Sequence, residues 1–267
     1  MESDPKYSER FCSPDSDITV SSSDRVLFKL HRTNLGVHSD IFPGVEANIP
    51  VQDEIVALEE EASTLELLFQ YVYPQRQPDL SKLNVRELAL LAEAAEKYSV
   101  YSAMEVCRLY MQAAKKRMPM EVLMYAARHG YTELCDEAAP YTLDADAAVA
   151  LKVMEGDLFK KWMLYREHRL RHHRRIYYSA INLGHTHEFE EADGPEECYL
   201  WPPFLWAILQ ELGKSLVAIH DSESQELFKK HRPMLEDCEE CMRRYFSLET
   251  SVVTGSFFLP KFTAIQC

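Results

Sequence analysis

Alternating apolar and polar residues near the N-terminus predict a β-hairpin. Val26, Phe28 and Leu30 mark one face of an extended segment, and a weaker alternation precedes them. A turn-like SSSDR stretch, residues 21–25, separates the two runs. Because strands show a period of two and turns are rich in serine and aspartate, residues 17–31 are predicted to form a hairpin.

The period then changes from two to that of a helix. Leu35, Ser39 and Phe42 stand at i, i+4 and i+7, so they are expected along one side of a helix that ends at residues 43–44, Pro-Gly. The short apolar run at residues 55–58 predicts one more strand before a charged segment.

Three further helices are predicted from their starts. In each, a serine or asparagine stands three residues before a glutamate, a spacing at which each side chain can accept the other residue's backbone N–H. The pairs are Ser63 with Glu66, Asn84 with Glu87, and Ser102 with Glu105. The expected buried faces are Leu65, Leu68, Phe69 and Val72 on the first helix; Leu88, Leu91, Ala92 and Ala95 on the second; and Val106, Leu109, Tyr110 and Ala113 on the third.

The second half of the chain has helical periodicity throughout. Helical segments are expected at residues 120–129, 132–139, 157–183, 204–220 and 224–246, with no clear period from about residue 250. The chain is therefore divided into a flexible N-terminus (1–14), a mixed domain (15–115), a helical domain (116–250) and a tail (251–267). The expected fold class is α+β followed by an all-α region.

Composition narrows the class of protein. Lysine and arginine number 29 against 43 acidic residues, and the resulting net charge of −14 argues against general affinity for nucleic acid or anionic membranes. The N-terminus does not have the pattern of a secretory signal, and no apolar run approaches the roughly 18 residues of a membrane span. Seven scattered cysteines favour reduced thiols, so a cytoplasmic or nuclear location is expected.

No common catalytic motif is present in the sequence. The phosphate-binding loop, the dinucleotide-binding glycine motif, the nucleophile elbow and the HExxH zinc motif are all missing. We therefore expect no enzyme, no catalytic residue and no cofactor.

Together, the signature residues resemble the BTB/POZ family. That family opens with an aspartate, a phenylalanine, a His-Lys/Arg pair, a leucine, a serine and a phenylalanine, which here correspond to Asp17, Phe28, His31, Arg32, Leu35, Ser39 and Phe42. The helical segments LELLFQYVYP (65–74) and LALLAEAAEKY (88–98), followed by Cys107, are similar to its later motifs. The resemblance covers about residues 15–115 and implies a small sheet with surrounding helices.

The remainder is similar to the helical extension of single-BTB proteins from mushroom-forming fungi. That similarity rests on VLMYAARHGYTELCDEAA (122–139) and on a late C-x-x-C motif.

The resemblance implies a non-enzymatic interaction protein with protein partners. Homodimerisation is one implied mode, and swapped dimers of the family use an N-terminal strand. A cullin scaffold of a ubiquitin ligase is the other implied partner, for which the chain would be a substrate adaptor. Many cullin-binding members place a hydrophobic residue two positions before a glutamate, but here Gly44 precedes Glu46 and Gln52 precedes Glu54, which departs from that pattern.

His31 and His38 invite a chemical interpretation that the pattern does not favour. An acid–base dyad would need His31 with Asp17, yet no nucleophile accompanies them. A structural role is favoured, in which buried His31 donates to Asp17 and fixes the hairpin on the helix. His38 is expected at the surface.

Cys238 and Cys241 form the most chemical-looking motif. A single C-x-x-C fits zinc ligation, redox chemistry or simple packing, and Cys198, His185 and His187 are the residues that could complete a tetrahedral zinc site. The sequence leaves these alternatives open, and no metal ligand is assigned.

The basic segment REHRLRHHRR (166–175) is the one local exception to the acidic charge. Its five arginines could contact phosphates. Leu158, Trp162, Tyr165 and Arg169 nevertheless share one helical stripe, which favours packing against the rest of the chain. A nuclear or transcriptional regulator with this basic helix and a structural zinc site is the rival functional hypothesis; contact with nucleic acid is not favoured.

Overall fold

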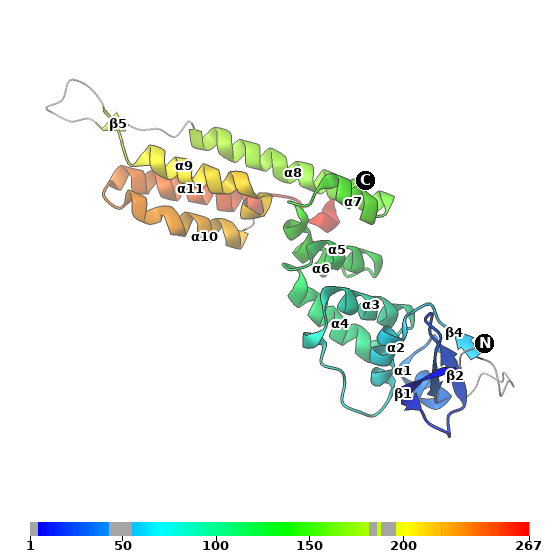
Figure 1. Ribbon diagram of the computed structural model, residues 1–267. Coiled ribbons are helices and arrows are strands. Elements are labelled where there is room, and N and C mark those ends of the chain that lie inside the picture. The colour runs from blue at the N-terminus through cyan, green and yellow to red at the C-terminus, as the bar shows by residue number, and fades with distance from the viewer. Residues whose placement is uncertain (1–4, 43–54, 182–185, 188–195, 220, 267) are drawn as a thin grey trace. The chain divides into compact units, whose positions relative to one another are not determined.

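The computed structural model describes residues 5–42, 55–181, 186–187, 196–219 and 221–266 (Figure 1). The chain divides into two compact units, Met1–His129 and Gly130–Cys267. Among the described residues, no helix combines the length and the apolar character that crossing a membrane requires.

The first unit contains a four-stranded sheet. Its strands are β1 (Lys6–Cys12), β2 (Ile18–Ser21), β3 (Val26–Leu30) and β4 (Ile55–Ala57), in the order β1-β3-β2-β4. β2 and β3 are antiparallel, whereas β1 runs parallel to β3 and β4 runs parallel to β2. The predicted hairpin and the predicted strand after it are confirmed.

The hairpin turn also supplies an acceptor to the start of helix α2 (Ala62–Leu68), which lies further along the chain. The Ser22 hydroxyl oxygen accepts the Val26 N–H at 2.9 Å, which closes the turn. The Asp24 carboxylate accepts the Ala62 N–H at 2.8 Å, although Ala62 lies far along the chain. One serine–aspartate turn thus serves two elements, because helix N-termini leave N–H groups that need acceptors.

The rest of the first unit is helical. Its helices are α1 (Arg32–His38), α2, η1 (Phe69–Val72), η2 (Leu80–Lys82), α3 (Val85–Lys97), α4 (Tyr101–Ala114) and α5 (Pro119–Arg128). The ring of Phe28 in β3 meets the ring of Phe69 edge to face at a centroid distance of 5.4 Å, and the ring of Phe11 in β1 lies 5.8 Å from that of Phe69. These three buried rings hold the sheet against the helices, each contributing about 1.5–3 kcal/mol through burial.

The predicted helix after the hairpin is shorter than expected. α1 ends at His38, so Ser39 and Phe42 are not on it; Ser39 has an extended backbone and pairs with Val100. The Ser39 hydroxyl accepts the N–H groups of Ile41 and Phe42 at 3.1 and 3.2 Å. Serine competes for backbone groups in this way and favours turns over helix interiors. Ser39 and Phe42 are still buried, as the apolar spacing indicated.

Only one of the three predicted capping pairs forms. Asn84 accepts the Glu87 N–H at 3.0 Å, and Glu87 accepts the Asn84 N–H at 2.9 Å, a complete capping box. α2 and α4 instead begin one residue before Ser63 and Ser102, whose side chains do not cap them. At α2 the acceptor comes from Asp24, so a local cap is not needed there.

The buried face of α4 also differs from the prediction. Ala103, Cys107, Met111 and Ala114 are buried, whereas Leu109 is 54% exposed. Apolar residues occupy two adjacent stripes of this helix, so periodicity alone does not choose between them. The buried stripe is the one with smaller side chains, which allows α3 and α4 to pack closely.

The second unit is helical. Its elements are α6 (Thr132–Ala138), η3 (Ala139–Thr142), α7 (Ala147–Val153), α8 (Gly156–Ile181), β5 (Thr186–His187), β6 (Glu196–Glu197), α9 (Trp201–Lys214), η4 (Leu216–Ile219), α10 (Asp221–His231), η5 (Arg232–Leu235), α11 (Glu239–Phe257) and η6 (Phe262–Ala264). α8, α9, α10 and α11 lie side by side (Figure 1). The single amphipathic segment predicted at 224–246 is wrong, because the chain turns at Pro233, which lacks an N–H for a continuous helix.

Both ends of the chain carry more structure than the sequence indicated. The N-terminal segment 1–14, expected to be flexible, contains β1, and the expected tail 251–267 contains the end of α11 and η6. Thr263 donates through its hydroxyl and its N–H to the Asp136 carboxylate, both at 2.8 Å. These bonds fix the last described segment on α6 within the same unit.

The capping box predicts a selective effect on stability. Replacing Asn84 by alanine should lower the free energy of unfolding by about 1 kcal/mol, because the Glu87 N–H loses its acceptor. Ser63→Ala is the matched control, since Ser63 lies exposed inside α2 and caps nothing, and it should change stability by less than about 0.5 kcal/mol. Urea unfolding of the full chain measures both; equal losses would contradict the assignment of helix starts.

Candidate functional site

The expected histidine pin lies at the bend between β3 and α1, but its partners differ from the prediction. The Tyr73 hydroxyl oxygen accepts the His31 backbone N–H at 3.1 Å and lies 2.9 Å from its Nδ1. His31 Nε2 lies 3.4 Å from Asp15 Oδ1. Asp17 instead accepts the Arg32 N–H at 2.7 Å, so the predicted pair of Asp17 with His31 is wrong. Asp17 serves the first N–H of the helix, which has a stronger need for an acceptor.

This bend is built for packing rather than for catalysis. The Tyr73 ring lies 5.5 Å from the ring of Phe11, and burial raises the pKa of its phenol, so the hydroxyl stays neutral. Phe28 and Leu35 are fully buried beside it. His38, expected at the surface, is half-buried. The signature residues therefore position the chain.

An exposed apolar patch on the same unit was missed by the sequence reasoning. Val37 is 73% exposed, Ile41 57% and Tyr101 53%. They are close together because Ser39 pairs with Val100 and the Tyr101 hydroxyl donates to Asp40. We call Val37, Ile41 and Tyr101 the α1–α4 patch. The signal in the sequence was weak, because Tyr101 joins the other two residues only through the pairing of Ser39 with Val100, which lies far along the chain.

Three cysteines of the second unit form a compact cluster. The Sγ atom of Cys198 lies 3.3 Å from that of Cys241 and 4.0 Å from that of Cys238. All three residues are buried, and their sulfur atoms lie within 4.8 Å of one another. Cys198 stands just before α9, while Cys238 and Cys241 stand at the start of α11. The fold thus brings together the cysteines that the sequence had singled out.

The two histidines considered with these cysteines are not placed. His185 lies outside the described residues. The backbone of His187 pairs with Glu196 in the small sheet of β5 and β6, but its side chain is outside the description.

Much of the basic segment 166–175 makes contacts within the second unit. Arg166 donates to the Leu143 carbonyl at 3.0 Å, and Arg169 lies over the Tyr165 ring. Arg171 pairs with Glu167 on the same helix at 3.0 Å. His172 is buried, which lowers its pKa to about 4 and keeps it neutral. The side chains that a polyanion would need are in large part engaged within the unit.

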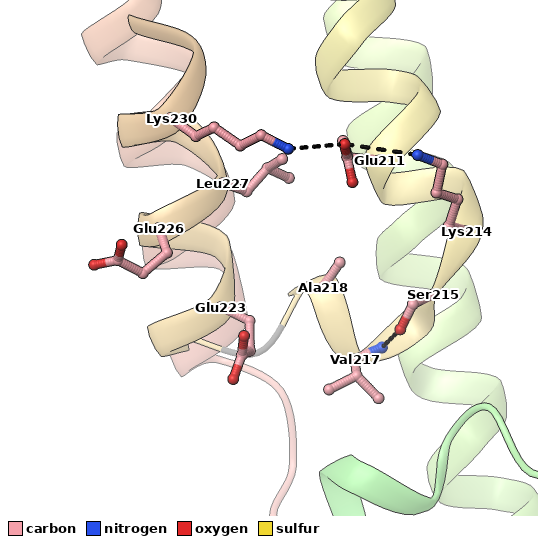
Figure 2. Close-up of a pocket in the computed structure, with 9 residues that line it drawn as sticks. All are labelled: Glu211, Lys214, Ser215, Val217, Ala218, Glu223, Glu226, Leu227 and Lys230. Carbon is pink, nitrogen blue, oxygen red and sulfur yellow. Dashed lines mark hydrogen bonds and ion pairs between the residues drawn. The ribbon is translucent and has the colours of Figure 1, made fainter.

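A surface pocket of about 550 Å³ lies between α9, η4 and α10 (Figure 2). Glu211 lies between two lysines of this pocket. Its Oε1 atom is 3.1 Å from Lys230 Nζ and 3.6 Å from Lys214 Nζ. The hydrogen bond from Lys230, with help from Lys214, lowers the pKa of Glu211. The Glu226 side chain points away from this group. A carboxylate paired with two exposed lysines is an arrangement typical of a solvated surface.

Comparison with known families identifies the first unit. Residues 9–115 match the family model of the BTB/POZ domain, so the resemblance seen in the sequence is confirmed for this part of the chain. The match agrees with the small sheet and surrounding helices described above. No curated protein matches the chain.

We expect the Tyr73 hydroxyl to contribute measurably to the free energy of unfolding. Tyr73→Phe keeps the ring contact with Phe11 but removes the acceptor of the His31 N–H, so the free energy of unfolding should fall by about 1 kcal/mol. His31→Ala keeps this backbone N–H but removes the 2.9 Å contact of Nδ1 with the same hydroxyl, a contact that Tyr73→Phe also removes. The loss in the double variant should therefore be smaller than the sum of the two single losses. Urea unfolding of the three variants provides the cycle. Full additivity would contradict the contact.

Proposed function

We propose that this chain, whose residues 9–115 are a BTB/POZ domain, is an interaction protein that self-associates through the α1–α4 patch. The BTB/POZ domain is a protein–protein interaction module, and its family is non-enzymatic. The observation that carries the proposal is the group of three large apolar side chains exposed on this domain. Burying such side chains against a partner gains about 25 cal/mol per Å² of apolar surface.

A second copy of the chain is the occupant that fits best. An isologous contact needs only one self-complementary patch, as in most homo-oligomers. The N-terminal strand that swapped family dimers exchange is here paired with β3 of its own chain. We therefore place the contact on the α1–α4 patch rather than on strand exchange.

The charge of the chain sets the character of this contact. Each chain has a net charge of −14, so two copies repel each other over the Debye length of about 10 Å at 0.1 M salt. Added salt should therefore strengthen an apolar self-association. Binding to a polyanion would instead weaken as salt rises.

An adaptor role for a cullin-type ubiquitin ligase is the finer form of this proposal, with the helical unit holding a client. The glutamates relevant to the cullin pattern, Glu46 and Glu54, lie outside the described residues. The test is purification of the chain at its native level, followed by detection of cullin. Absence of cullin would restrict the proposal to self-association.

Charge placed in the patch should break the proposed dimer. Val37→Glu with Ile41→Glu should weaken self-association by at least tenfold, about 1.4 kcal/mol, because the buried carboxylates would lose their water. Leu90→Glu with Ile55→Glu is the matched control, since it adds the same charge at apolar residues that are 41% and 52% exposed elsewhere on the unit.

Analytical ultracentrifugation of the full chain at low and moderate salt measures the effect. A monomeric wild-type protein, or an equal loss in both double variants, would sink the self-association proposal.

A further inference from the structure

We infer that Cys198, Cys238 and Cys241 together bind one zinc ion. Zinc holds thiolate sulfurs at about 2.3 Å in a tetrahedron, which sets neighbouring sulfurs about 3.8 Å apart. The two sulfur–sulfur distances from Cys198 are 4.0 and 3.3 Å, which bracket that value. Small movements of three side chains would therefore suffice to complete the coordination.

Cys238 caps the start of α11, with its sulfur facing the backbone of the first turn. The Cys241 backbone N–H points to Cys238 Sγ at 3.4 Å, and the Met242 N–H donates to the Cys238 carbonyl at 3.0 Å. Cys238 and Cys241 thus share the first turn of α11, which fixes the two sulfurs of the motif on one side of the cluster.

The surrounding charges do not oppose metal binding. Glu239 and Glu240 separate the two cysteines of the motif and would repel a thiolate. Arg243 lies 3.0 Å from one Glu240 oxygen, and Arg244 lies 3.2 Å from the other. These cations offset the local negative charge on the first turns of α11.

Binding replaces three thiol protons by one cation. Each S–H bond breaks, its proton passes to solvent, and three thiolates with Zn²⁺ give a site of net charge −1. Without metal, burial raises the pKa of the Cys241 thiol, so the group stays neutral there. The fourth tetrahedral position is left to water or to a ligand beyond these three residues.

The ion would join parts of the bundle that are distant in sequence. The three cysteines belong to one buried core with Trp201 and Phe204 of α9 and Tyr245 of α11. Zinc at this point would clamp the start of α9 to the start of α11, and its binding free energy would become folding free energy of the second unit.

The main rival is an oxidised pair. A disulfide between Cys198 and Cys241 would need the sulfurs to approach to about 2.05 Å and an external oxidant to take two electrons and two protons. Six cysteines of the described part of the chain, these three included, are unbridged. The zinc site and the disulfide consume the same thiols, so one experiment separates them.

The experiment measures metal in the full chain, purified under reducing conditions and dialysed with zinc. Elemental analysis should find about one zinc ion per chain in the wild-type protein. Loss of an outer-sphere partner typically weakens metal binding by about 10- to 100-fold. Cys238→Ser and Cys241→Ser each remove a direct ligand, so each should weaken zinc binding by more than that. Cys135→Ser is the matched control, because Cys135 is buried in the same unit but outside the cluster, and it should keep the ion.

A second readout covers the case in which a serine variant does not fold. Cobalt added to metal-free wild-type protein should give thiolate-to-cobalt charge-transfer absorption and tetrahedral visible bands, and a chelator should lower the unfolding temperature. A wild-type chain without zinc or cobalt bands would overturn the inference, as would a Cys198–Cys241 disulfide found by mass mapping in its place. Zinc retained by the Cys238 and Cys241 variants would overturn it equally.

Discussion

The BTB/POZ domain depends on acceptors for the backbone N–H groups at its bends. The first N–H groups of a helix have no acceptor within the helix, and a side-chain acceptor at such a start typically contributes about 1 kcal/mol. Asp17 accepts from Arg32, Tyr73 from His31, and Asp24 from Ala62. Each acceptor comes from a different segment, so satisfying the bends also sets how the hairpin, α1 and α2 lie against one another.

This constraint explains which parts of the fold the sequence could predict. The hairpin and the existence of most helices follow from local periodicity, and their prediction was confirmed. The partner of His31 could not be found in the same way, because Tyr73 lies 42 residues further along the chain. Ser63 and Asn84 stand in the same local motif, yet only Asn84 caps a helix, because Asp24 already serves the start of α2.

In the candidate sites, too, local motifs were predictable from the sequence, whereas contacts between distant segments were not. The spacing of Cys238 and Cys241 is visible in the sequence, but only the α8–α11 bundle brings Cys198 to them across 40 residues. The exposed patch was not predicted, because it combines residues that are far apart in the sequence. The pairing of Ser39 with Val100 brings Tyr101 to Val37 and Ile41, and no local pattern indicates that pairing.

The α1–α4 patch depends on the pairing of Ser39 with Val100. Once Ser39 leaves the helix to pair with Val100, the chain presents Ile41 to solvent and brings Asp40 to the Tyr101 hydroxyl. The patch is thus held by backbone pairing and a hydrogen bond before any partner arrives. Preorganised side chains lose less conformational freedom on binding, so a small apolar surface can support association. Two copies with a net charge of −14 each repel one another at long range. The free energy of self-association must therefore come from apolar surface buried at short range.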